Sequence, residues 1–451
     1  MAISSSGIGS GLDVNLIVSQ LMSAERAPIT TLKARQSTYN AKLSAYGTLK
    51  STLDSLKTTL KGLDGQGMAA RSVTSSNDKV LGASVGSGAV PGTYAIEVSN
   101  LAQQHKLMSP GFADAKAALG NGSLTLQVGG ADPVTLPAAD YTLQGLSNAI
   151  NAAKAGVSAT IINDGTESRL VLTANQSGKD NTVKITATGG LSAFEYDPLA
   201  PPAAGTGLEQ KQAALDAQFT IDGIPVSSAS NKAADAIQGV TLNLSKTNVG
   251  EAVTLTVEND KTAVKAAIKT FVDAYNKLNT TVRSMTAYNA TAQSGAVLNG
   301  DTGASSIITG LRKELTASVS GAGGLNSLSN IGIAFQRDGS LAIDDAKLQK
   351  AMDGSFDDVA ALFSGTDGYT ARLTAATTSM LGTGGVIASR TEGLNSSIRS
   401  LTERQADMEV LLAQTEKRYR AQFTALDSMM NSMQSTSNFL AQQLASLSNN
   451  S

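Results

Sequence analysis

The placement of the prolines constrains the fold of this 451-residue chain more than any other feature. One proline is Pro28, the other eight lie between Pro91 and Pro225, and none follows. Proline is excluded from helix interiors because its ring removes a backbone donor and clashes with the preceding turn. The sequence therefore predicts helices at both ends and a middle rich in strands and loops.

The N-terminal segment is predicted to form two helices that meet near Pro28, the first capped by Asp13. From Tyr46 to Leu63 the apolar spacing alternates between three and four residues, as in a coiled-coil seam. The first helix has an apolar face with no local cover. The predicted N-terminal assembly residues are Val14, Ile17, Val18, Leu21, Leu32, Tyr39, Tyr46, Leu49, Leu53, Leu56, Leu60 and Leu63.

The C-terminal segment contains neither glycine nor proline from Leu394 to Ser451 and is predicted to be one long helix. Polar residues interrupt its seam, notably Gln405, Thr415 and Gln422, and such residues weaken a coiled coil while helping to specify its register. The predicted C-terminal assembly residues are Ile398, Leu401, Met408, Leu412, Tyr419, Leu426, Met433, Leu440, Leu444 and Leu447.

A narrow apolar stripe cannot be buried by a lone helix in water, so each terminal segment needs a partner. Pairing within one subunit satisfies the pattern, and so does contact with other copies or other proteins. The glycines of GIGSGLDVNLIVSQLM do not form a phosphate loop, because no strand precedes them and no lysine follows. They are interpreted as a flexible end of the first assembly helix.

The middle of the chain predicts strands over 71–84, 94–100, 124–128, 134–136, 157–162, 168–173, 219–222, 240–244 and 253–258. A helix is expected over 143–154 and another over 261–285. The proline-rich stretch 189–214 is interpreted as a mobile loop. A hairpin turning at Asp338-Gly339 leads into a helix that Asp344 would cap.

The order of these elements predicts a multidomain α+β fold. The two terminal helical segments are expected to lie together at one end, and the β-rich middle is expected to be an insertion that projects from the other end. Residues 1–42 and 406–451 are expected to form a terminal coiled-coil leg, and 43–70 with 261–405 a helical bundle carrying a small hairpin. Residues 71–110 with 215–260 are expected to form a β-rich domain, and 111–214 a second β-rich domain inserted into it.

Composition argues against several classes of function. The formal charge is −2 with no long basic run, so no nucleic-acid partner is expected, and no apolar run reaches the roughly 18 residues of a membrane span. Cysteine is absent and His105 is the one histidine, so a thiolate site or a histidine pair is impossible. His105 is interpreted as an ordinary strand-edge residue.

The carboxylate pairs Asp344/Asp345 and Asp357/Asp358 are interpreted as helix caps, because each stands at a predicted helix start. No acid, base, nucleophile or metal set remains, so neither catalysis nor a cofactor is expected. The first basic residue is Arg26 and residues 2–11 are rich in serine and glycine, which does not resemble a cleaved signal peptide.

Several segments resemble one known family. The run ISSSGIGSGLDVNLIVSQLMSAERAPI and the run KRYRAQFTALDSMMNSMQSTSNFLAQQLASL are similar to the two ends of the flagellar hook-associated protein 2 family, the filament caps. Residues 141–186 resemble the insertion motif shared by flagellins and hook-associated proteins. IGIAFQRDGSLAIDDAKLQKAM and AIKTFVDAYNKLN resemble the C-terminal half of the family.

The resemblance implies a homo-oligomeric ring, often a pentamer, at the distal tip of the bacterial flagellum. Such a ring retains flagellin and promotes its folding and insertion. The terminal helices would be legs on the filament end, and roughly Arg71–Asp260 the cap plate. Further implied partners are hook-associated junction proteins and an export chaperone on the C-terminal helix, with secretion by the flagellar type III route. A junction protein, a flagellin-like subunit and a surface adhesin remain as alternatives.

Overall fold

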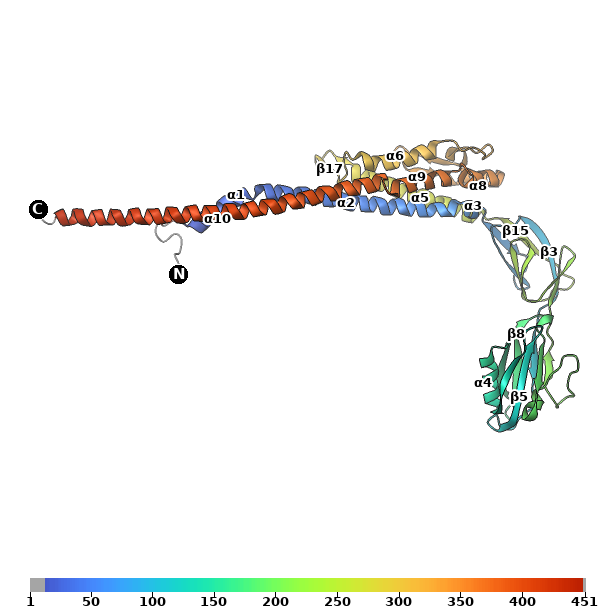
Figure 1. Ribbon diagram of the computed structural model, residues 1–451. Helices are drawn as coiled ribbons and strands as arrows, with labels where there is room; N and C mark the ends of the chain where they lie inside the picture. The colour runs from blue at the N-terminus through green and yellow to red at the C-terminus, as the bar shows by residue number, and fades with distance from the viewer. Residues whose placement is uncertain (1–12, 449–451) are drawn as a thin grey trace. The chain divides into compact units, whose positions relative to one another are not determined.

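The structure is a computed structural model that describes residues 13–448 (Figure 1). It divides into two compact units. The helical unit contains the described residues up to Gly65 and from Lys265 onward, and the β unit contains Gln66–Val264. This division confirms the predicted multidomain α+β fold with helical ends and a strand-rich middle, whereas the finer division into four domains stays a prediction.

The helical unit begins with α1 (Val14–Glu25), α2 (Ala27–Thr59) and the 3-10 turn η1 (Leu60–Leu63). A single turn, α3 (Gly65–Met68), leads into the β unit. The chain returns through α5 (Lys261–Thr286), α6 (Thr302–Thr316), η4 (Leu328–Ile331), α7 (Asp345–Gly354), α8 (Phe356–Ser364), α9 (Tyr369–Leu381) and α10 (Val386–Ser448). Two small hairpins join them, β16 (Tyr288–Asn289) with β17 (Ser294–Gly295) and β18 (Ile333–Phe335) with β19 (Leu341–Ile343).

Local signals fix the ends of these helices as predicted. Asp13 accepts a hydrogen bond from the Leu16 amide at 2.9 Å, and Pro28 stands at the start of α2, where a missing N–H costs nothing. Asp344 caps α7 by accepting from the Lys347 amide at 3.1 Å. The other carboxylates predicted at helix starts, Asp345, Asp357 and Asp358, are not caps. They lie in the first turns of α7 and α8, where their charge favours the helix dipole.

The core of the helical unit forms where α2 packs against α9 and α10, and α6 packs against α9. The apolar residues of α2 and η1 from Tyr46 to Leu63 are almost fully buried in it. Burying each such side chain contributes about 1.5–3 kcal/mol. Tyr46 also donates to Oδ1 of Asp301, the N-cap of α6, at 2.7 Å. Gly303 lies against this contact, since a Cβ there would collide with the Tyr46 hydroxyl and Arg390.

One part of the β unit has two sheets around one core. The five-stranded sheet has the order β1-β15-β3-β11-β12 and the three-stranded sheet the order β13-β14-β2, with neighbours antiparallel. The strands are β1 (Arg71–Ser75), β2 (Leu81–Val85), β3 (Gly92–Asn100), β11 (Ala217–Ile221), β12 (Ile224–Ser228), β13 (Lys232–Ile237), β14 (Val240–Leu244) and β15 (Val253–Asn259). Inward-facing residues such as Ile96, Phe219 and Leu255 fill the space between them.

The other part of the β unit pairs a four-stranded sheet, β10-β4-β8-β7, with a three-stranded sheet, β6-β5-β9. Its strands are β4 (Gln104–Met108), β5 (Ala118–Val128), β6 (Val134–Thr142), β7 (Val157–Asn163), β8 (Ser168–Ser177), β9 (Val183–Ala187) and β10 (Glu209–Gln212). The helix α4 (Leu143–Ala153) buries Leu146 and Ile150 in the shared core, as its amphipathic sequence predicts.

Two predictions for the middle of the chain are wrong. Residues 71–84 are not one strand, because a turn bonded through Asn77 separates β1 from β2 and the two strands enter different sheets. Residues 189–214 are not simply a loop, because Phe194, Tyr196 and Leu208 are buried in the second core. That stretch also includes the short 3-10 helix η3 (Gly189–Phe194) and the strand β10, which pairs with β4.

The prediction that His105 is a strand-edge residue is also wrong. It lies on β4, inside a sheet, and is only 1% exposed. Its Nδ1 accepts from the Val183 amide of β9 at 3.0 Å, and its Nε2 bonds Oε1 of Gln210 on β10 at 3.1 Å. The Tyr196 hydroxyl donates to the same Gln210 oxygen at 2.7 Å. Burial lowers the pKa of His105, so the neutral ring joins the two sheets.

Candidate functional site

The terminal helices of the helical unit pair with each other in one subunit. We call α1, the start of α2 (residues 27–42) and α10 from residue 394 onward the helical arm. Gln36 donates to the Thr402 hydroxyl, the Tyr419 hydroxyl donates to Glu25, and Arg420 donates to Asn15. Along these three contacts the residue numbers decrease on α1 and α2 while they increase on α10. The helices on the two sides of the arm are therefore antiparallel (Figure 1).

The apolar face of α1 is covered by α10, so the prediction of a face with no local cover is wrong. Val14, Val18 and Met22 are buried against Leu412, Tyr419 and Phe423. Ile17 is half-buried and Leu21 is 39% exposed, so Leu21 is not part of the contact. The contact residues on α1 are four apart, whereas a period of 3.6 residues per turn alone would place Leu21 closer to the direction of Val14 than Met22. The way in which α1 lies against α10 therefore selects Met22 over Leu21.

The predicted seam on α2 runs through two environments. Leu32 and Tyr39 are half-buried within the arm. The later members of the seam along the chain lie in the core of the helical unit, and they are Tyr46, Leu49, Leu53, Leu56, Leu60 and Leu63. Burial, together with the hydrogen bond to Asp301, raises the pKa of Tyr46 well above its usual range. This part of the seam is a folding core.

The seam on α10 follows the predicted heptads as far as Tyr419. Leu401 and Thr415 are buried, and the remaining predicted residues of this stretch, Ile398, Met408, Leu412 and Tyr419, are half-buried. The next contact is Phe423, whereas the predicted seam residue Gln422 is exposed. Sequence reasoning missed Met22 and Phe423, although a step of four residues from Val18 and from Tyr419 would have found both.

Beyond Phe423 the apolar face of α10 is open. We call residues 424–445 the distal segment. The predicted assembly residues Leu426, Met433, Leu440 and Leu444 are 43%, 64%, 54% and 67% exposed, and Met429, Met430 and Phe439 are exposed beside them. Asp427 is the one charged residue in the segment. The side chain of Leu447, the last predicted residue, lies outside the described residues.

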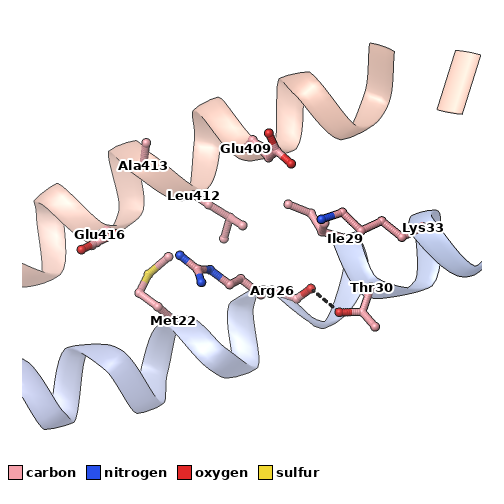
Figure 2. A pocket seen from close by; sticks show the side chains of 9 residues that line it. All are labelled: Met22, Arg26, Ile29, Thr30, Lys33, Glu409, Leu412, Ala413 and Glu416. Atoms are coloured by element: carbon pink, nitrogen blue, oxygen red, sulfur yellow. Dashed lines mark hydrogen bonds between the residues drawn. The ribbon is translucent and has the colours of Figure 1, made fainter. Parts of the chain in front are cut away.

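A groove opens where α1 passes into α2 (Figure 2). Its volume is about 350 Å³, and Figure 2 shows Met22, Leu412 and Ile29 lying between the two helical segments. Charged residues from both sides form its rim, and they are Arg26, Lys33, Glu409 and Glu416. The break after Glu25 interrupts the regular packing of α10 on its partner helices, which leaves this space.

Neither metal chemistry nor a membrane span has support in the described part of the chain. Between residues 13 and 448, no three His, Asp or Glu side chains gather in a way that could hold a metal ion. No helix among those residues combines the length and apolar character that a bilayer crossing requires. The open apolar face of the distal segment makes the arm the candidate functional site.

Comparison with known proteins covers most of the chain. The family models described as flagellar hook-associated protein 2 N-terminus and C-terminus match residues 10–105 and 214–435. A model described as the flagellin hook IN motif matches residues 123–176.

Individual relatives agree with the family models. A flagellar hook-associated protein 2 of Escherichia coli (strain K12) is 36% identical over 466 residues and covers 99% of each chain. A B-type flagellar hook-associated protein 2 of Pseudomonas aeruginosa is 34% identical over 400 residues, or 84% of each chain. The crystal structure of the flagellar cap protein FliD D1-D2-D3 domains from Escherichia coli superposes with a TM-score of 0.69 at 37% identity. It covers 78% of this chain and 99% of that one.

Proposed function

Because the chain belongs to the flagellar hook-associated protein 2 family, we propose that it caps the growing flagellar filament as a ring of identical subunits. The related structure from Escherichia coli is that of a flagellar cap protein, so the role is structural and lies at the flagellum. The ring retains exported flagellin at the tip and promotes its folding and insertion, which makes it necessary for filament elongation.

The observation that carries this proposal is the distal segment. Most apolar surface of a folded chain is covered, and an open apolar face of this length marks an interaction site. The face follows one side of a helix, which suits a partner helix laid along it. We assign the filament end as its occupant in the assembled cap, with the arm as the leg of each subunit.

The proximal part of the arm supports a leg that is ordered before it binds. Pairing of α10 with α1 and α2 holds the base of the distal segment on the helical unit, which lowers the conformational entropy lost on docking. Thr415 in the seam keeps that pairing weaker than an all-apolar zipper. A leg of moderate affinity can release and rebind as each flagellin is added.

Further partners belong to the same proposal. The exposed, nearly uncharged distal segment needs cover before assembly, and an export chaperone on the C-terminal helix would supply it. Secretion follows the flagellar type III route, and junction proteins lie at the other end of the same filament. A secondary adhesive role for the β unit is part of the same proposal, and binding of mucin glycans to the full chain tests it.

The experiment is complementation of a cap-deficient strain with this chain, followed by electron microscopy of the filaments. The proposal expects long filaments, a ring on one tip, and little monomeric flagellin in the medium. A junction protein or a flagellin-like subunit would leave the leakage of flagellin unchanged. Continued leakage with normal expression and export of the chain contradicts the cap assignment.

A further inference from the structure

A second groove lies on the helical unit, away from the arm. It runs between α5 and α6 beside the tip of the β18–β19 hairpin and has a volume of about 530 Å³. Val282, Ile308 and Phe335 contribute apolar surface, and Ser305, Thr309 and Thr286 contribute hydroxyls. A groove with mixed lining of this kind accepts a protein surface better than a purely apolar ligand.

Three arginines line this groove and give it a positive charge. Arg283 pairs with Asp338, with 3.4 Å between Nη1 and Oδ2. Arg312 lies over the ring of Phe335, 5.7 Å from its centroid, and Arg337 is exposed at the hairpin tip. Arg312 also interacts with the Tyr275 side chain, but neither Arg312 nor Arg337 forms an ion pair within the described residues. Two guanidinium charges at the groove therefore have no carboxylate partner in the described part of the chain. We call this the arginine groove.

Glycine at position 339 keeps Arg312 at the groove. Gly339 has φ of +79°, in the left-handed region that the hairpin turn requires. A Cβ at this position would collide with Nη2 of Arg312. The turn therefore both bends the hairpin and leaves room for the guanidinium beside it.

The same unit carries an opposite charge on α8. Between Lys350 and Arg372 the sequence contains four aspartates and no basic residue. One of them, Asp367, is paired with Arg372. Asp357 is exposed and Asp358 half-buried in the first turn of α8, and no ion pair of the described chain includes either. Unpaired charges of both signs thus lie on one compact unit.

We propose that the arginine groove of one copy receives Asp357 and Asp358 of the neighbouring copy. This inference rests on the proposed ring, because a head-to-tail contact between identical subunits needs two different, complementary surfaces on one body. Guanidinium groups suit this role since they bind carboxylates through two parallel N–H donors. Charge pairs at a rim set the register and rate of association more than its strength.

Self-association of the full-length chain at low ionic strength, measured by analytical ultracentrifugation, tests the proposal. The double variant Arg312→Glu/Arg337→Glu places like charges against the acidic turn, and its dissociation constant should rise at least about tenfold. The variant Asp357→Lys/Asp358→Lys should show a similar rise. Combining the four changes restores opposite charges, and the constant should return to within about threefold of the parent.

Controls separate this effect from loss of the fold. Lys313→Glu changes the same charge on an exposed neighbour outside the groove and should leave association unchanged. Since Arg312 packs on Phe335, the milder double variant Arg312→Gln/Arg337→Gln is measured together with Arg312→Glu/Arg337→Glu. Circular dichroism confirms that each variant is folded. The glutamine variant should lose the salt dependence of association.

The outcomes distinguish the groove from the ring. A parent chain that stays monomeric at all concentrations, and shows no ring on filament tips, overturns the ring and this contact together. A parent that associates while folded groove variants associate equally well overturns the contact alone. The contact is also contradicted if the variant that combines all four substitutions fails to restore association. An equally large rise of the dissociation constant in Lys313→Glu would contradict it as well.

Discussion

Two stretches of α10 share one apolar period but have opposite surroundings. From residue 394 to Phe423 the helix packs on α1 and α2, and the apolar seam residues are buried or half-buried. From residue 424 to 445 the same apolar period continues, yet the four predicted seam residues there are each more than two-fifths exposed. Periodicity therefore predicts that an apolar helix face needs a partner. Only the folded structure shows which part of that face is covered by helices of the same chain.

This difference assigns two roles to one helix. The covered stretch contributes to the stability of the helical unit, and the open stretch contributes to binding. Residues in the first should therefore affect unfolding, whereas those in the second should affect assembly alone. The following changes test that separation, beginning with the largest expected effect.

Truncation after Phe423 should abolish capping while both units stay folded. The removed residues make no buried apolar contact within the described chain, so the melting temperature should change by less than about 2 °C. Flagellin released into the medium and circular dichroism check the two halves of this expectation. Normal filament length in the truncated strain would contradict the assigned role of the distal segment.

Two apolar truncations compare the core with the open face. Leu53→Ala in the core should lower the free energy of unfolding by about 2–5 kcal/mol, because it leaves a cavity. Met433→Ala in the distal segment should change it by less than about 0.5 kcal/mol. Urea titration of the full chain measures both, and a similar loss in the two variants would contradict the proposed contrast between the buried core and the distal segment.

A pair of polar seam residues repeats the comparison on a smaller scale. Thr415→Leu fills a buried seam position and should strengthen pairing within the arm by about 1 kcal/mol, whereas Gln422→Leu acts at an exposed position and should add nothing. Hydrogen exchange of the α1 amides measures arm pairing. Tighter pairing should also slow filament growth in the Thr415→Leu strain, since the leg must release at each step. Equal protection in both variants would show that the seam passes through Gln422.

Substitution of His105 is expected to have the smallest effect on stability. Because His105 lies in the β unit, it also provides a reference for the changes made in the arm. Burial lowers its folded pKa below the usual 6.5, so the unfolded chain binds a proton first as pH falls. The contribution of the neutral ring is complete above about pH 6.5 and declines below it. His105→Gln should remove this pH dependence from the unfolding of the β unit and leave the helical unit unchanged. A pH dependence that persists in the variant would place its source elsewhere.

Local sequence signals predicted much of the fold. Pro28, the cap Asp13 and the turn at Asp338-Gly339 act within a few residues, so they mark element ends that the structure confirms. β10 was missed because its residues, Glu209 to Gln212, are polar and become a strand only by pairing with β4. The burial of His105 depends on partners 78 and 105 residues away along the chain, which no local pattern specifies.

The candidate site was predicted only in part, for the same reason. Heptad spacing found the arm, but Met22 and Phe423 are selected by how α1 and α10 meet. The heptad pattern also placed Leu53 and Leu440 in one class, although one lies in a folding core and the other on an open face. The arginine groove has no sequence signature, because α5, α6 and the hairpin bring its charges together from separate segments.

The central claim is that the distal segment docks on the filament end. The chain has no cysteine, so Met433→Cys allows a single spin label on the distal face, and Asp132→Cys, in an exposed turn of the β unit, provides the matched control. Electron paramagnetic resonance of the full chain is recorded alone and after addition of filament ends. The account predicts that the label at 433 becomes immobilised and that the label at 132 keeps its mobility. Equal mobility at 433 before and after the protein seats on filament tips would contradict the account.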